Sequence, residues 1–182
     1  MCGIFLSQLQ LSAKVFCTFF LLGIGCGQLA AVTQAATAVG LSYQEVVASL
    51  APEMPMVPVA PGQMSAEKEI DIGELSAAAK TRIRTPLLIQ TSHTHLFSQT
   101  LIAGLLGLIF LFSSLREGKK VLILSLPFVG TVIDIGGMWL TRFVWQPFAV
   151  LVLVGGSLFA LGYLLITAIS LYELWGKKEA RV

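Results

Sequence analysis

The chain has 182 residues, of which 55% are hydrophobic and only 12% are charged, and its mean hydropathy is +0.83. A water-soluble domain of this size cannot cover so much apolar surface, so an ordinary soluble fold is excluded. The formal net charge of +2 is too small, and too divided among loops, for a nucleic-acid-binding surface. The charged residues lie between long apolar runs, which is typical of a chain that crosses a lipid bilayer.

The first apolar segment runs from Val15 to Ala38, behind Lys14. Its length suits a complete membrane span, for which roughly 20 apolar residues are needed. The triplet Ala36-Thr37-Ala38 is also typical of a signal-peptide cleavage site. We therefore predict that residues 1–38 form a signal anchor or a cleaved signal peptide, and we favour the anchor.

An extracytoplasmic loop is predicted over residues 39–91. It begins with Ser42 and Glu45 in the spacing of a capping box, which predicts a short helix that ends near Leu50. A stiff polyproline II spacer is expected next, because proline recurs at every third position. The prolines concerned are Pro52, Pro55, Pro58 and Pro61.

The second half of this loop has its own capping-box pattern. Asp71 and Glu74 predict a helix that reaches about Arg82, and Pro86 is expected to break the chain before the next span. The loop is too small, and too poor in large apolar residues, to form a domain alone. We expect it to pack against the ends of the membrane helices.

Three further spans are predicted, and with the first they make an all-α integral membrane four-helix bundle. They cover about 95–115, 121–140 and 148–172, within a membrane domain of residues 92–182. The connection between the second and third spans and the C-terminal tail are short and basic, which places both in the cytoplasm by the positive-inside rule. Both termini are therefore predicted to be cytoplasmic, and the loop of residues 39–91 periplasmic.

The third span contains a carboxylate, Asp134. Its insertion at membrane depth costs about 2.5–3.5 kcal/mol, so it should face protein or water. Helical spacing places it on a stripe of mostly small and polar residues that we predict to be a packing face: Pro127, Gly130, Thr131, Asp134, Gly137, Met138 and Thr141. Comparable stripes are Ser92, His95, Gln99, Ala103 and Gly107 in the second span, and Gly156, Ala160, Tyr163, Thr167 and Ser170 in the fourth.

A polar site is predicted where these stripes converge. The second span enters from outside and the third leaves there, so Asp134 should lie in the same half of the membrane as His95 and Gln99. One interpretation is structural: Asp134 is protonated, or bonded to Gln99, Thr131 or a histidine, and fixes helix register. The other is a functional polar site, whose candidate residues are Asp134, His93, His95, Gln99 and Thr131.

The two histidines raise the alternative of a metal or haem site. On a regular helix, positions two apart point about 200° from each other, so His93 and His95 could share an ion only from an extended segment. Met138 could serve as a second axial haem ligand beside His95. Soft copper ligands could come from Met54, Met56 and Met64.

Enzyme signatures are missing from the sequence. There is no phosphate-binding G-x-x-x-x-G-K-[ST] loop, no H-E-x-x-H zinc motif and no G-x-S-x-G nucleophile motif. We therefore predict a protein that is not an enzyme and has no cofactor, with haem or copper as the alternative.

Several short motifs carry a resemblance to a known family: Ser92-His93-Thr94-His95-Leu96-Phe97, Leu126-Pro127-Phe128, Asp134-Ile135-Gly136-Gly137, Gln146-Pro147-Phe148-Ala149 and Ser170-Leu171-Tyr172. Over about residues 92–175, the chain resembles a family of small bacterial inner-membrane proteins with an S-H-x-H-L-F motif. Some relatives carry a c-type haem segment with C-x-x-C-H between the first two spans, which implies a link to electron transfer. This sequence lacks that motif. The resemblance implies a bacterial inner membrane, and importance for His93, His95 and Asp134.

Two functions stay open at this point. The leading hypothesis is an accessory or assembly subunit of the inner membrane, whose glycine-rich helix faces and outer loop bind a membrane-protein partner or a second copy of the chain. The alternative is a redox-associated membrane protein that binds haem or copper near the periplasmic face.

Overall fold

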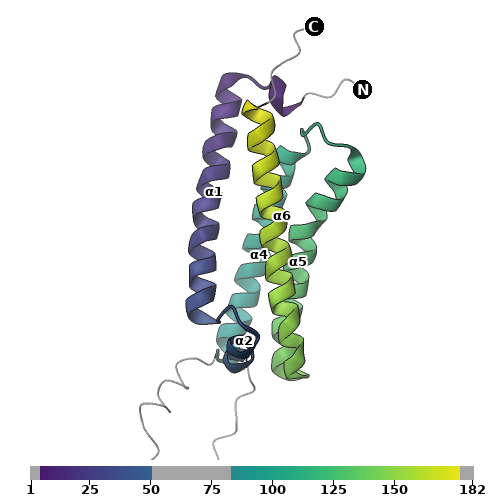
Figure 1. Cartoon of the computed structure of the whole chain (residues 1–182). Helices are drawn as coiled ribbons and strands as arrows, with labels where there is room; N and C mark the ends of the chain where they lie inside the picture. Colours follow the sequence, from purple (N-terminus) through teal and green to yellow (C-terminus); the bar gives the residue numbers. More distant parts are fainter. Residues whose placement is uncertain (1–4, 51–82, 177–182) are drawn as a thin grey trace, which may run out of the picture.

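The computed structural model describes residues 5–50 and 83–176, and all the regular secondary structure in this part of the chain is helical (Figure 1). The predicted proline spacer and the second capping box lie outside the described residues. The elements in chain order are the 3-10 turn η1 (Leu6–Gln8), α1 (Leu11–Ala38), α2 (Tyr43–Leu50), α4 (Thr85–Phe110), α5 (Glu117–Phe143), the 3-10 turn η2 (Gln146–Phe148) and α6 (Ala149–Trp175).

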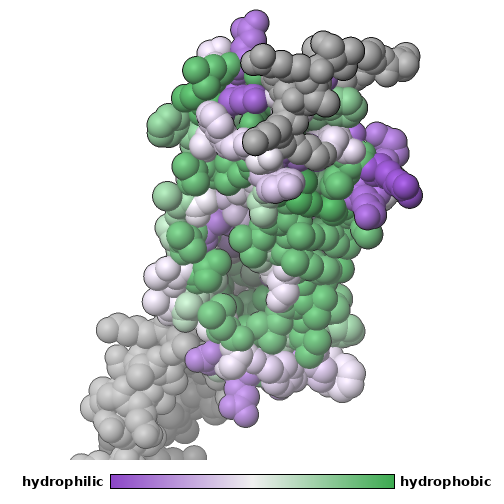
Figure 2. Space-filling view, turned by 45° about the horizontal axis from the view of Figure 1, so that its top comes forward, coloured by the Kyte–Doolittle hydropathy of each residue, from purple (hydrophilic) through white to green (hydrophobic). Residues whose placement is uncertain are grey.

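Four helices, α1, α4, α5 and α6, are long and apolar enough to cross a membrane. The space-filling view shows a broad apolar band with hydrophilic surface near its two ends (Figure 2). The predicted all-α, four-span membrane architecture is therefore confirmed. The short helix α2 lies across one end of the bundle, and we call this the α2 end (Figure 1).

Helix α4 begins ten residues before the predicted start of the second span, at Thr85 instead of residue 95. Pro86 does not break the chain here, because it occupies the first turn of α4. A proline is well tolerated there, since the missing N–H would have no helical partner in any case. The predicted loop of residues 39–91 therefore ends in a helix, and both histidines lie within that helix.

The capping box at α2 forms as predicted. The Glu45 amide donates to Ser42 Oγ at 3.3 Å, and the Glu45 carboxylate accepts from the Ser42 amide at 2.9 Å. The Ser42 hydroxyl bond to this carboxylate, supported by the Ser42 and Leu41 amides, lowers the pKa of Glu45. Gly40, with a φ of 92°, lets the chain turn tightly against Glu45.

The closest helix pair is α5 and α6, which touch along glycines. A Cβ added at Gly130 would lie 2.5 Å from the amide nitrogen of Phe159, and one at Gly137 would lie 2.7 Å from that of Val152. A Cβ at Gly155 would collide with the backbone of Asp134. The predicted α5 stripe is buried throughout, which confirms it as a packing face.

The stripe predicted in the fourth span is only partly correct. Gly155, which that stripe omits, packs against α5, whereas Gly156 is exposed. The two glycines are neighbours in sequence and about 100° apart around the helix. The sequence pattern alone did not distinguish the face toward α5 from the face beside it.

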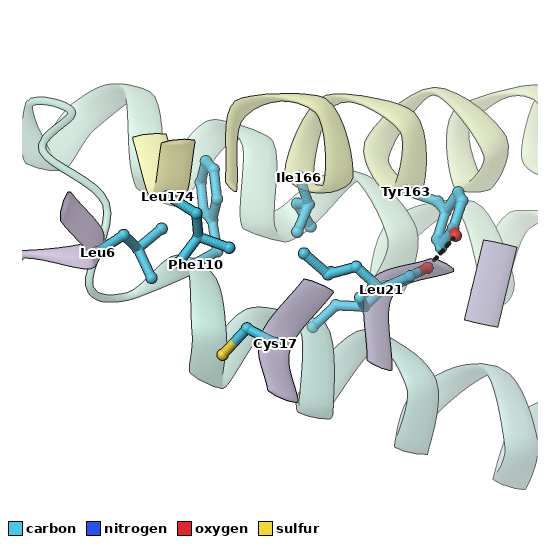
Figure 3. Close-up of a cluster of buried hydrophobic side chains, with 8 residues drawn as sticks. Leu6, Cys17, Leu21, Phe110, Tyr163, Ile166 and Leu174 are labelled. Carbon is cyan, nitrogen blue, oxygen red and sulfur yellow. Dashed lines mark hydrogen bonds between the residues drawn. The ribbon is translucent and has the colours of Figure 1, made fainter. Parts of the chain in front are cut away.

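The apolar core consists of two clusters. The α1 cluster, which includes residues of α1, lies at the end opposite α2 (Figure 3) and contains Leu6, Cys17, Leu21, Leu106, Phe110, Tyr163, Ile166 and Leu174. The α2 cluster contains Val46, Leu50, Leu88, Met138, Ala149 and Val152. Since Val46 and Leu50 belong to α2, the start of the loop packs against the helix ends as expected.

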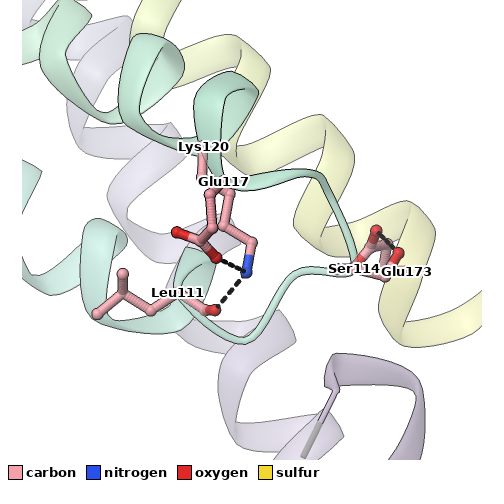
Figure 4. Close-up of polar contacts among 5 residues, drawn as sticks. All are labelled: Leu111, Ser114, Glu117, Lys120 and Glu173. Atoms are coloured by element: carbon pink, nitrogen blue, oxygen red, sulfur yellow. Dashed lines mark hydrogen bonds and ion pairs between the residues drawn. The ribbon is translucent and has the colours of Figure 1, made fainter. Parts of the chain in front are cut away.

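Polar side chains close the end opposite α2, around the turn between α4 and α5 (Figure 4). Lys120 donates to the Leu111 carbonyl at 3.1 Å and pairs with Glu117 at 3.3 Å. The buried carboxylate of Glu173 accepts from the Ser114 amide at 2.8 Å and from the Ser114 hydroxyl at 2.6 Å. Glu173 therefore ties α6 to this turn.

Candidate functional site

Two contacts set the register between the antiparallel helices α4 and α5. Trp139 Nε1 donates to Ser92 Oγ at 2.8 Å, and a Cβ at Gly107 would lie 3.3 Å from the Leu124 side chain. The two contacts are 15 residues apart on both helices. Asp134, five residues before Trp139, therefore lies level with Phe97, between His95 and Gln99. This is the depth that the chain order predicts.

This depth separates the two apolar clusters. On α4, the α2 cluster ends at Leu88 and the α1 cluster begins at the half-buried Ile102. The residues between them on the same helix face include His95 and Gln99. We call the layer formed by His95, Gln99, Thr131 and Asp134 the polar level.

Within the polar level, His95 and Gln99 are the two residues that have a buried polar atom without a hydrogen bond to any described residue. Both are half-buried, and one helical turn separates them on the face of α4 that continues to Leu106. His95 Nδ1 and Gln99 Oε1 are each shielded from solvent without a hydrogen-bond partner among residues 5–50 and 83–176. A bilayer interior supplies no such partner, so these atoms favour a polar group brought in from elsewhere.

Asp134 and Thr131 lie instead along the seam between α5 and α6. Thr131 Oγ1 donates to the Pro127 carbonyl at 2.9 Å, and Asp134 is 7% exposed, with its backbone against Gly155. In the described part of the chain, Asp134 forms no hydrogen bond with Gln99, Thr131 or a histidine. The expected bonded cluster is thus not formed, although its members share one depth.

The histidines do not act together in this structure. His93 is exposed and its ring lies 6.4 Å from that of Phe97, on a different face of α4 from His95. The extended segment that would let both histidines hold one ion is absent, because α4 is helical here.

Metal binding by His95 and Met138 stays a prediction. Met138 is buried in the α2 cluster, among Leu88, Val152 and residues of α2. Within residues 5–50 and 83–176, no three His, Cys, Asp or Glu side chains come together as metal ligands would.

A comparison with protein families matches the model of a transmembrane helical domain, Aq_1264_TM, to residues 76–181, more than half of the chain. The chain belongs to this family. No curated protein and no solved structure matches it. The matched range contains α4, α5 and α6, with every candidate of the polar site and Met138, whereas α1 and α2 precede it. The copper-ligand candidates Met54, Met56 and Met64 also precede it and lie outside the described residues.

Three charged residues of the Aq_1264_TM domain are buried where the sequence analysis expected none: Lys120, Arg142 and Glu173. Arg142 is 4% exposed, and it donates to the Leu50 carbonyl at 3.4 Å and to Thr85 Oγ1 at 3.2 Å. It thereby joins α2, α4 and α5 at the α2 end. Glu173, 3% exposed, has the corresponding role at the opposite end. Charges in the last turn of a helix are usually solvated, so nothing in the sequence pattern marked Arg142 or Glu173.

Proposed function

We propose that this protein is a non-catalytic accessory or assembly subunit that binds another transmembrane helix through the outward face of α1. Only Cys17 and Leu21 of this helix are buried. The opposite side carries exposed Phe16 and Phe19, at 68% and 72%, followed by the small residue Gly23. No described residue packs on this long helix face, which is therefore available to lipid or to a partner.

The glycine spacing on α1 favours a partner helix over lipid on this face. A Cβ at Gly23 or Gly27 would meet nothing within 4 Å, and glycines four residues apart allow two membrane helices to approach closely. Gln34 lies further along the same outward face and is exposed. The glycines of α5 and α6, by contrast, already pack against each other's helices inside the molecule. The proposal rests on the Gly23/Gly27 pair, because no described residue packs against either glycine.

Replacing these glycines tests the proposal. Gly23→Leu with Gly27→Leu should weaken association by at least about tenfold, because bulky side chains keep the partner helix away. The measurement is recovery of a stoichiometric complex in mild detergent, together with oxidative crosslinking at the neighbouring Cys26, which is exposed.

Gly104→Leu is the matched control, because a Cβ at this α4 glycine also meets nothing within 4 Å. It should leave the complex intact. A wild-type chain that stays monomeric under crosslinking, or an equal loss in the control, would contradict the proposal.

We further propose a bacterial inner membrane, with both termini in the cytoplasm. The basic residues Lys14, Arg116 and Lys119 lie at the end opposite α2, which supports that end as the cytoplasmic one. The test introduces single cysteines into a cysteine-free chain. Gly118→Cys should react with an impermeant maleimide only after the cells are permeabilised, whereas Gln146→Cys should react in intact cells. The reverse pattern would invert the topology.

A redox role is the second candidate, and His95 is the observation that favours it. Its buried Nδ1 has no hydrogen-bond partner in the described part of the chain, and imidazole is a common ligand of haem iron and copper. The purified protein should then show a haem absorption band or bound copper that His95→Leu removes. A colourless, metal-free sample from a haem-sufficient host would overturn this candidate.

A further inference from the structure

Helix α1 touches the bundle near both of its ends and leaves an opening between them. At one end the Tyr163 hydroxyl donates to the Leu21 carbonyl at 3.4 Å (Figure 3). At the other end Val39 packs on the α2 cluster. Between these contacts, none of the α1 residues 26–38 is buried. Figure 1 shows α1 and α6 diverging toward the α2 end, and Figure 2 shows a hollow in the apolar band with hydrophilic surface inside it.

The walls of this opening continue the three helix faces that form the α1 cluster. On α1, the face of Cys17, Leu21 and Ile24 continues to Gln28 one turn later. The face of α4 that carries Leu106 also continues toward the α2 end, and so does the face of α6 that carries Tyr163. We call the opening the α1 window, and its walls are Gln28 of α1, His95 and Gln99 of α4, and Ala160 and Gly156 of α6.

The α1 window is unfilled and polar. A Cβ at Gly156 would meet nothing within 4 Å, although one at the adjacent Gly155 would collide with α5. Among the described residues, the buried atoms His95 Nδ1 and Gln99 Oε1 have no hydrogen-bond partner, and Gln28 forms no hydrogen bond. Three partly buried polar side chains from two helices therefore lie on the helix faces that line the α1 window.

The shape and charge of the α1 window restrict the class of molecule that can bind in it. A transmembrane helix does not fit, because the α1 and α2 clusters close the window at both ends. The depth lies well inside a hydrocarbon core of about 30 Å, away from phospholipid head groups. The wall residues include no charged side chain, which favours a neutral ligand. Imidazole and amide groups both donate and accept hydrogen bonds, so they complement carbonyl and hydroxyl oxygens.

We propose that the α1 window binds a neutral, membrane-soluble molecule that has carbonyl or hydroxyl oxygens on a compact head and an apolar tail, as quinones do. The molecule enters sideways from the bilayer, and Gln28, His95 and Gln99 hydrogen-bond its oxygens. This binding does not depend on the outward face of α1, so it goes beyond the proposed partner function.

The test uses the full chain in lipid nanodiscs, titrated separately with decylubiquinone and with dioctanoylglycerol, which distinguish a quinone ring from a glyceride head. Dodecylbenzene, which has a tail but no oxygen, is the control ligand. A ligand that binds the folded state raises the thermal unfolding midpoint in a saturable way. We expect this rise with at least one of the two oxygen-bearing compounds and none with dodecylbenzene.

Substitutions at the window residues test whether the ligand binds in the α1 window. His95→Leu and Gln99→Leu should each weaken binding about tenfold, the usual effect of one lost hydrogen bond, and His93→Leu should not weaken it. Gly156→Phe should fill the window and abolish binding while the fold is kept. The proposal is overturned if neither compound raises the midpoint, if dodecylbenzene raises it equally, or if the rise survives in Gly156→Phe. It is also overturned if a photocrosslinker at Gln28 captures a polypeptide in place of lipid-soluble ligand.

Discussion

Gly155→Ala is expected to destabilise the folded protein by about 3 kcal/mol, the upper part of the usual range for overpacked cores. The added Cβ would collide with the backbone nitrogen and Cα of Asp134 and lie 2.7 Å from the Gly130 carbonyl oxygen. Backbone atoms cannot swing aside as a side chain can, so α5 and α6 would have to separate. The measurement is the free energy of unfolding in detergent, or the thermal midpoint in nanodiscs.

Gly156→Ala is the matched control for this experiment. It makes the same chemical change one residue along the same helix, at a site where the new Cβ meets nothing within 4 Å. We expect a change within about 0.5 kcal/mol, as for most substitutions away from a packed contact. Equal effects at the two glycines would show that the tight α5–α6 seam is not what holds these helices together.

Glu173→Ala is expected to cost about 2–3 kcal/mol, because it removes a charged acceptor of two hydrogen bonds. The Ser114 amide and hydroxyl would lose a carboxylate that now accepts from them at 2.8 and 2.6 Å (Figure 4). The turn between α4 and α5 should then open more often. Besides the unfolding free energy, faster tryptic cleavage after Arg116 would report this opening.

Glu117→Ala is the control for the second experiment. Glu117 is an acid in the same region, but its side chain is 85% exposed and, among the described residues, pairs with Lys120 alone. Surface ion pairs contribute about 0–1 kcal/mol, so its removal should have a small effect. If both variants lost the same stability, the buried carboxylate would have no special role in tying α6 to the turn.

Local patterns in the sequence predict the helices and much of their burial. The apolar runs identify the four spans, because only a lipid environment tolerates such length without charge. The pair of Ser42 and Glu45 predicts α2, since both bonds of a capping box form within four residues. The α5 stripe around Asp134 predicts a packing face, because a carboxylate at this depth must be turned from lipid.

Contacts between distant segments were decided only by the tertiary structure. Helical spacing shows that α6 has a small-residue side, but whether Gly155 or Gly156 meets α5 depends on how the whole helix is rotated against its neighbour. Arg142 and Glu173 are buried and form hydrogen bonds with distant segments of the chain, although each lies at a helix end, where charged side chains are normally solvated. The divergence of α1 from α6, with none of the α1 residues 26–38 buried, likewise has no local signal.

The physical reason for this division is the range of the interactions. Hydrophobicity, capping and helical period act within a few turns of chain, so the sequence by itself determined the class of protein, its spans and the packing face of α5. Rotation, register and the spaces left between helices depend on which surfaces fit together once every helix is placed. The tertiary structure therefore decided that Asp134 is buried in the seam between α5 and α6, while His95 and Gln99 of α4 stay half-buried outside that seam.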